Sequence, residues 1–230
     1  MELKVTLKDP KKPEYFYEEA IKTLRTNVLF TSKRVKTILL TSCYPNEGKS
    51  DLAFHLAVEM GKAGKKVLLL DADIRKSVYI RRYSIKQNIQ GLSQYLSGQV
   101  DKQWITYHTN YPNLDMIFSG PLAPNPSELL GDQAFDEFLE EKKAEYDFIF
   151  IDTPPLGTMI DAAVVAEKCD GAILVIESEL VSYKVAQKAK VQLEKSGCRI
   201  LGAVLNKVDM KKDKYYSSYY GRYGEYYKNK

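Results

Sequence analysis

Short apolar runs alternate with amphipathic segments along this chain of 230 residues. Most of the apolar runs are continuous rather than alternating, as expected for strands that are buried on both faces of a parallel sheet. The predicted strands are residues 37–40, 67–70, 114–118, 148–151, 171–176 and 200–205. The predicted helices are residues 15–30, 50–63, 125–143, 162–167 and 181–196. This alternation predicts an α/β fold whose mainly parallel sheet is flanked by helices.

No change of composition divides the chain, so we expect one domain over residues 1–210, followed by a flexible tail over 211–230. The net charge of +4 is too small to indicate a nucleic-acid partner. The three cysteines show neither metal-ligand nor disulfide spacing, which favours a reduced, cytoplasmic compartment. The apolar runs are too short to span a bilayer, so any membrane association is expected to go through a partner.

The first predicted strand leads into a loop, residues 43–50, and then into a helix. In such a loop the backbone N–H groups and the helix N-terminus bind phosphate. Lys49 would neutralise β- and γ-phosphate oxygens, and the Ser50 hydroxyl would ligate Mg²⁺. The residues expected to contact the nucleotide here are Pro45, Asn46, Glu47, Gly48, Lys49, Ser50 and Asp51. The loop therefore predicts a site for ATP and Mg²⁺.

Two positions depart from the usual phosphate-binding loop. Cys43 stands where the pattern normally has its first glycine. Asp51 places a carboxylate near the incoming triphosphate, although an acid in the first turn also interacts favourably with the helix dipole. Further along, Arg81 and Arg82 could contact phosphates or a partner, and a solvated face is the favoured interpretation.

Carboxylates follow two more of the predicted strands. Asp71 and Asp73 are two residues apart at a strand end, so they point the same way and suit Mg²⁺ or a general base. Asp152 follows four apolar residues, the Walker B arrangement in which an Asp reaches Mg²⁺. Asn206 ends the last strand and either hydrogen-bonds adenine or makes a simple turn. Asp161 either supports the metal site or is unrelated to it.

The last 20 residues, 211–230, lack any aliphatic periodicity. Seven of the chain's 17 tyrosines lie there: Tyr215, Tyr216, Tyr219, Tyr220, Tyr223, Tyr226 and Tyr227. Aromatic rings among Gly, Ser and Lys cannot pack a core, which suggests that their hydroxyl groups are the functional part. Each phosphate would add a charge of about −1.5 to −2 and turn a basic tail acidic. A low-complexity adhesive tail and a patch for polyanions or a membrane are the alternatives.

Taken together, these motifs resemble the bacterial tyrosine kinases of capsular and exopolysaccharide synthesis, a deviant P-loop group related to division-site and partition ATPases. The resemblance rests on residues 45–50, 71–75, 91–98, 125–130 and 151–155 and on the tyrosine-rich end. It implies a P-loop NTPase-like protein-tyrosine autokinase that uses ATP and Mg²⁺ and regulates polysaccharide synthesis and export. It implies that Lys49, Asp71 and Asp73 are catalytic, that Ser50, Asp73 and Asp152 hold the metal, and that the tail tyrosines are phosphorylated.

The resemblance extends to partners. Glu19, Lys22 and Arg25 match the family's oligomerisation helix, with Lys22 where Arg is often found. This implies a homo-oligomeric ring in which each tail enters the neighbouring active site. The apparent lack of a membrane segment matches the stand-alone cytoplasmic Gram-positive form, which works with a transmembrane activator of the polysaccharide co-polymerase type and a cognate tyrosine phosphatase. No nucleic acid is expected.

Three other functions fit parts of the sequence. A switch ATPase of the partition or division type usually has a second Lys early in the loop, and residues 43–46 contain none. A nucleotide-binding adaptor without catalysis, phosphorylated by another kinase, would be favoured by Cys43 and Asp51. An iron–sulfur carrier would need two suitably placed cysteines, which this sequence does not supply.

Overall fold

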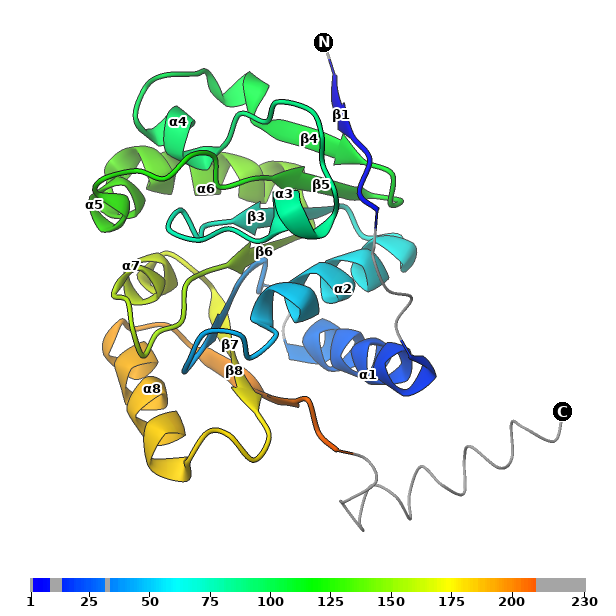
Figure 1. The fold of residues 1–230 in the computed structure, drawn as a ribbon, viewed down its shortest axis with the longest axis vertical. Coiled ribbons are helices and arrows are strands. Elements are labelled where there is room, and N and C mark those ends of the chain that lie inside the picture. Colours follow the sequence, from blue (N-terminus) through cyan, green and yellow to red (C-terminus); the bar gives the residue numbers. More distant parts are fainter. Residues whose placement is uncertain (1, 9–13, 32–33, 210–230) are drawn as a thin grey trace, which may run out of the picture.

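One mainly parallel sheet forms the centre of the computed structural model, which describes residues 2–8, 14–31 and 34–209 (Figure 1). The strand order is β1-β4-β5-β3-β6-β2-β7-β8. All neighbouring pairs are parallel except β4 with β5. The strands are β1 (Leu3–Val5), β2 (Thr37–Ser42), β3 (Val67–Asp71), β4 (Thr106–Thr109), β5 (Leu114–Ile117), β6 (Phe148–Asp152), β7 (Gly171–Glu177) and β8 (Ile200–Asn206).

Helices cover both faces of this sheet (Figure 1). They are α1 (Tyr15–Thr31), α2 (Lys49–Lys62), α3 (Tyr79–Arg82), α4 (Leu92–Leu96), α5 (Pro126–Gly131), α6 (Gln133–Glu145), α7 (Asp161–Glu167) and α8 (Tyr183–Lys195), with a 3₁₀ turn at Lys102–Trp104. Helices α1, α2 and α3 contribute to one hydrophobic cluster, and α6, α7 and α8 contribute to another.

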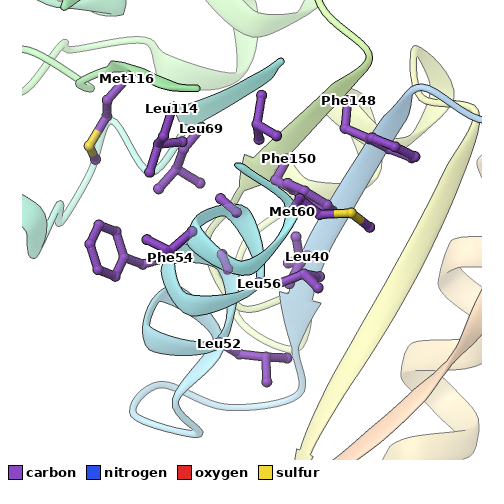
Figure 2. Close-up of a cluster of buried hydrophobic side chains, with 14 of the residues drawn as sticks. Leu40, Leu52, Phe54, Leu56, Met60, Leu69, Leu114, Met116, Phe148 and Phe150 are labelled. Carbon is purple, nitrogen blue, oxygen red and sulfur yellow. The ribbon is translucent and has the colours of Figure 1, made fainter. Parts of the chain in front are cut away.

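The continuous apolar runs of the central strands are explained by these two clusters. In β2, Ile38 and Leu40 belong to the cluster beneath α2, whereas Leu39 belongs to the opposite one. The same alternation places Phe150 under α2 and Ile151 on the other side. Figure 2 shows the first cluster, in which α2 side chains pack against side chains of β2, β3, β5 and β6. Each central strand is therefore apolar throughout because both of its faces are covered.

All six predicted strands are present, and two short ones were not predicted. Strand β1 has three residues and β4 has four, too few for a clear periodic signal. The predicted helix over residues 125–143 is wrong as a single element, because α5 and α6 are separated at Asp132. Asp132 is extended (φ −69°, ψ 151°) and its side chain accepts the N–H of Ala134 at 2.8 Å. This N-cap begins a new helix where apolar periodicity alone suggested continuation.

Within residues 2–8, 14–31 and 34–209, the structure contains no helix with both the length and the apolar character that a bilayer crossing requires.

Gly61, near the end of α2, makes a close backbone contact that we use as a test of the fold. A Cβ atom at this position would lie 2.3 Å from the carbonyl oxygen of Pro112. Although Ala is favoured over Gly inside a helix by about 1 kcal/mol, the clash requires a backbone shift. We expect Gly61→Ala to lower the free energy of unfolding by about 1–3 kcal/mol in urea denaturation.

The matched control is Gly202→Ala in β8, where an added Cβ would meet no atom within 4 Å. We expect this variant to be as stable as the parent or slightly more stable, because Ala reduces the entropy of the unfolded chain. Equal stability of the Gly61→Ala variant and the parent would contradict the packing of α2 described here.

Candidate active site

The loop between β2 and α2 lies at the carboxyl edge of the sheet, where β3 and β6 also end. Gly48 precedes α2 in the left-handed conformation, with φ of 86°. A Cβ on Gly48 would lie 2.3 Å from Nδ2 of Asn206, so both its conformation and its surroundings favour glycine. The first N–H groups of α2 have no acceptor within the helix. The loop and helix start thus present the donors that an anion such as a phosphate requires.

Glu47 holds this loop from inside. Its carboxylate is fully buried and accepts the backbone N–H groups of Tyr44 and, at 3.0 Å, of Glu177 at the end of β7. Burial raises the pKa of Glu47, and the two N–H groups oppose that rise because they stabilise the charged form. Glu47 therefore stabilises the conformation of the loop by linking it to the end of β7 from the buried side.

Asn206 fastens the same loop from β8. Its Nδ2 donates to the carbonyl oxygen of Glu47 at 2.8 Å, and Nζ of the following Lys207 donates to the carbonyl oxygen of Asn46 at 2.6 Å. Lys207 also pairs with Glu177 at 2.8 Å. The structure thus places Asn206 beside the loop, while its contact with adenine stays a prediction.

Lys49 joins three sequence motifs. Its Nζ lies 3.4 Å from Oδ1 of Asp152 and 3.8 Å from Oδ2 of Asp73, and it donates to Oγ of Ser50 at 3.2 Å. All four residues are nearly or fully buried. Lys49 and Asp152 are about a hundred positions apart in the sequence. They meet because Lys49 follows the loop after β2, Asp152 ends β6, and these two strands are neighbours in the sheet.

The carboxylates suit a divalent cation. Oδ1 of Asp152 is buried and accepts no hydrogen bond within the described part of the chain. It lies with Oδ2 of Asp73 and the Ser50 hydroxyl around the Lys49 ammonium. Mg²⁺ prefers oxygen ligands and commonly takes one or two carboxylates together with substrate phosphates. The residues present therefore fit Mg²⁺. A group of three or more His, Cys, Asp or Glu side chains suited to a metal does not occur among the described residues.

Asp71 and Asp73 differ in their surroundings. Asp71 is fully buried; its Oδ2 accepts Oγ of Ser77 at 2.5 Å and the N–H of Ser119 at 3.3 Å. Burial, followed by the negative charge of Asp152, raises the pKa of Asp71 to about 7. Burial also raises the pKa of Asp73, and the charge of Lys49 opposes this rise. Asp71 therefore lies behind the site in a fully buried, hydrogen-bonded position, and Asp73 faces the ammonium group.

The carboxylate of Asp161 forms an ion pair with Arg75. Arg75 forms two hydrogen bonds to its carboxylate, from Nε at 2.5 Å and from Nη2 at 3.1 Å. The Asp161 side chain is fully buried, and that of Arg75 is one-third exposed. Nη2 of Arg75 also reaches Oγ of Ser127 at 3.3 Å. This pair ties the loop after β3 to the start of α7, so Asp161 supports the site from a distance.

Sequence reasoning missed three residues that shape the site. Ser77 and Ser119 hydrogen-bond Asp71, and the buried hydroxyl of Tyr79 donates to the carbonyl oxygen of Ser50 at 3.0 Å. Ser77 and Tyr79 follow Asp71 by only a few positions, and this proximity is the signal that could have identified them. Ser119 contacts Asp71 through its backbone N–H, so its residue type gives no signal of this contact.

The proposed oligomerisation residues lie together on α1. Nζ of Lys22 pairs with Glu19 at 2.7 Å, and Nη1 of Arg25 lies 3.5 Å from Glu59 of α2. The tail tyrosines Tyr215–Tyr227 lie outside the described residues.

The loop, the buried lysine and the strand-end carboxylates define a nucleotide-binding P-loop protein of the α/β class. The chain matches a protein family described as an AAA domain over residues 35–195. It is 41% identical over 209 residues to tyrosine-protein kinase CpsD of Streptococcus agalactiae, a match that covers 91% of this chain and 89% of that protein. The chain therefore belongs to this family of bacterial tyrosine-protein kinases.

Solved structures agree with this membership. The chimerical protein CapA2B2 superimposes with a TM-score of 0.79 at 32% identity, covering 90% of this chain and 94% of that one. The septum site-determining protein MinD of Pyrococcus horikoshii, complexed with Mg-ADP, gives a TM-score of 0.66 at 26% identity, covering 76% of this chain and 71% of that one. The fold is thus shared with MinD, while the similarity to CapA2B2 extends over more of the chain.

Removing the Asp161 carboxylate tests the link between the loop after β3 and α7. We expect Asp161→Ala to lower the free energy of unfolding by about 3 kcal/mol, because the partly buried Arg75 loses its counter-ion. Chemical denaturation measures this loss. Glu141→Ala, which breaks an exposed pair with Lys102, is the control and should leave the free energy of unfolding unchanged. Equal effects of the two variants would mean that the Arg75–Asp161 pair contributes little to stability.

Proposed function

We propose that this protein is an ATP- and Mg²⁺-dependent tyrosine autokinase that regulates capsular or extracellular polysaccharide synthesis and export. The observation that carries the proposal is the convergence of Lys49, Asp73 and Asp152 beside a phosphate-binding loop. Family membership supports the choice of tyrosine as acceptor. Nucleotide binding follows from the fold, and the role of each residue is our proposal.

In the proposed reaction, Lys49 and the loop N–H groups bind and orient the β- and γ-phosphates. Ser50, Asp73 and Asp152 would hold Mg²⁺, which would neutralise charge on the phosphate oxygens. The tyrosine oxygen forms a bond to the γ-phosphorus while the bond from that phosphorus to the β-bridging oxygen breaks, releasing ADP. Asp71 accepts the phenol proton, as the carboxylate that remains for this task when Asp73 and Asp152 are assigned to the metal. This assigns different tasks to Asp71 and Asp73.

The acceptor tyrosines are proposed to be those of the tail, residues 211–230, attached to a kinase domain of residues 1–210. Asn206 and Lys207, close to the start of this tail, contact the phosphate-binding loop. Strand β8 therefore ends beside the phosphate-binding loop, at the edge of the sheet where phosphate transfer would occur. In a ring, a tail attached at this edge would be presented to the active site of a neighbouring subunit, which raises the effective concentration of the acceptor.

The assembly is proposed to be a homo-oligomeric ring built through α1, at the cytoplasmic side of a membrane. Phe30 and Tyr15 on α1 are 82% and 53% exposed, which is unusual for large aromatic side chains and suits an interface. A transmembrane activator of the polysaccharide co-polymerase type would recruit the ring, and a cognate tyrosine phosphatase would reverse the modification.

The ring proposal predicts that α1 substitutions weaken self-association. We expect a Glu19→Ala, Lys22→Ala and Arg25→Ala triple variant to shift towards monomer in light scattering at a concentration where the parent is oligomeric. The Lys190→Ala and Glu194→Ala double variant removes an exposed ion pair from α8 and serves as control. An unchanged mass for the triple variant would place the interface elsewhere.

The kinase proposal is tested by intact-mass spectrometry before and after incubation with ATP and Mg²⁺, followed by mapping of the modified peptides. We expect successive additions of one phosphate mass to the Tyr215–Tyr227 cluster. In Lys49→Met the rate of phosphate transfer should fall by about a hundredfold or more, because this variant loses a main group that stabilises charge on the phosphates. Lys62→Met is the control, since this lysine lies on the same helix but is 54% exposed and pairs with Glu59.

The other outcomes separate the alternatives. Steady ATP hydrolysis without phosphate on tyrosine would favour a switch ATPase of the MinD type. Absence of both activities, even with a peptide of the activator's cytoplasmic segment, would favour a nucleotide-binding adaptor.

A further inference from the structure

The unusual acid of the phosphate-binding segment, Asp51, has a specific partner in the structure. Asp51 lies in the first turn of α2, directly after Ser50. Its Oδ1 accepts a hydrogen bond from Nη1 of Arg82 at 3.1 Å, and His55 Nδ1 lies 3.9 Å from its Oδ2. The two side chains of the Arg82–Asp51 pair are 33% and 41% exposed, so solvent reaches both. The carboxylate is thus held towards α3.

A free carboxylate in this position would oppose nucleotide binding. The unpaired N–H groups of the first turn, with Lys49, form the positive environment that a triphosphate needs. A negative charge within a few ångströms of phosphate oxygens is repulsive, and near a protein surface such repulsion is stronger than in bulk water. The ion pair with Arg82 offsets part of this charge and holds the carboxylate towards α3.

Helix α3 is held firmly enough to orient Arg82. The buried Tyr79 at its start donates to the carbonyl oxygen of Ser50 at 3.0 Å. Tyr79 stacks on Tyr83 with ring centroids 6.1 Å apart, and Tyr83 packs on Phe54 of α2 at 4.3 Å. The guanidinium of Arg82 therefore projects from a short helix that is attached to the first turns of α2.

We infer that Arg82 is a positioning residue for nucleotide binding, which neutralises Asp51 and keeps its carboxylate away from the phosphates. The inference rests on the proposed binding of ATP at this loop and adds a residue that the loop motif does not include. Neighbouring Arg81 is exposed and takes no part in the pair. The two arginines thus have different surroundings despite being adjacent in the sequence.

A double-mutant cycle in Asp51 and Arg82 tests this inference, with the dissociation constant of Mg·ATP measured by isothermal titration calorimetry. We expect Arg82→Gln to raise that constant about three- to tenfold, because an uncompensated carboxylate then faces the phosphates. In an Asp51→Asn background the same substitution should change the constant by less than about twofold, since the charge to be neutralised is gone. The coupling should decrease at high salt, where exposed charges are screened.

Two controls isolate the pair. Arg81→Gln removes the same charge from the adjacent position and should leave the dissociation constant unchanged. Arg82→Lys keeps the positive charge and should restore most of the affinity, which distinguishes neutralisation from a general need for the Arg82 side chain. Far-UV circular dichroism verifies that each variant keeps the secondary-structure content of the parent. If Arg82→Gln does not fold, Arg82→Met, which removes the charge and keeps the apolar stem, takes its place in the cycle.

The results that overturn the inference are distinct from those that overturn the proposed function. An equal weakening by Arg82→Gln in both backgrounds would show that Arg82 contacts the nucleotide itself. No weakening in either background would show that Arg82 does not control the effect of Asp51 on nucleotide binding. Wild-type protein that fails to bind Mg·ATP would instead overturn the proposed function, and this inference with it.

Discussion

The buried ammonium group of Lys49 between two carboxylates is the interaction on which the site depends. Its charge allows Asp73 and Asp152 to stay close together inside the protein, where neither carboxylate would be tolerated alone. The nearby Asp71 adds a third carboxyl group. The cluster therefore contains more acidic than basic groups, and this excess leaves a natural place for a cation that arrives with a nucleotide.

The scaffold holds these charges in place by ordinary packing. Strands β2, β3 and β6 are covered by apolar side chains on both faces, so their ends are rigid and their register is fixed. Contacts from β7 and β8 then fasten the loop, through the N–H of Glu177 and the side chain of Asn206. Loop and carboxylates are thus supported from several directions, which is the preorganisation that phosphoryl transfer requires.

Much of the fold was predictable because its signals are local. Each central strand appears as a continuous apolar run. Asp71 and Asp152 directly follow two of these runs, and Lys49 follows another after the phosphate-binding loop. The short strands β1 and β4 and the helix break at Asp132 were missed, since three or four residues or one cap give little periodic signal. The pairing of Asp161 with Arg75, a contact across 86 residues of sequence, could not be predicted from local signals.

The sequence by itself determined the class of fold, the phosphate-binding loop and the acidic strand ends, because each of these features depends on residues within one short segment of the chain. It also identified the tyrosine-rich tail as a candidate substrate by composition. Only the tertiary structure decided which charges are paired: Lys49 with Asp152, Arg75 with Asp161 and Arg82 with Asp51. Such pairing depends on which strands and helices become neighbours, and the order of strands in a sheet is a property of the whole chain.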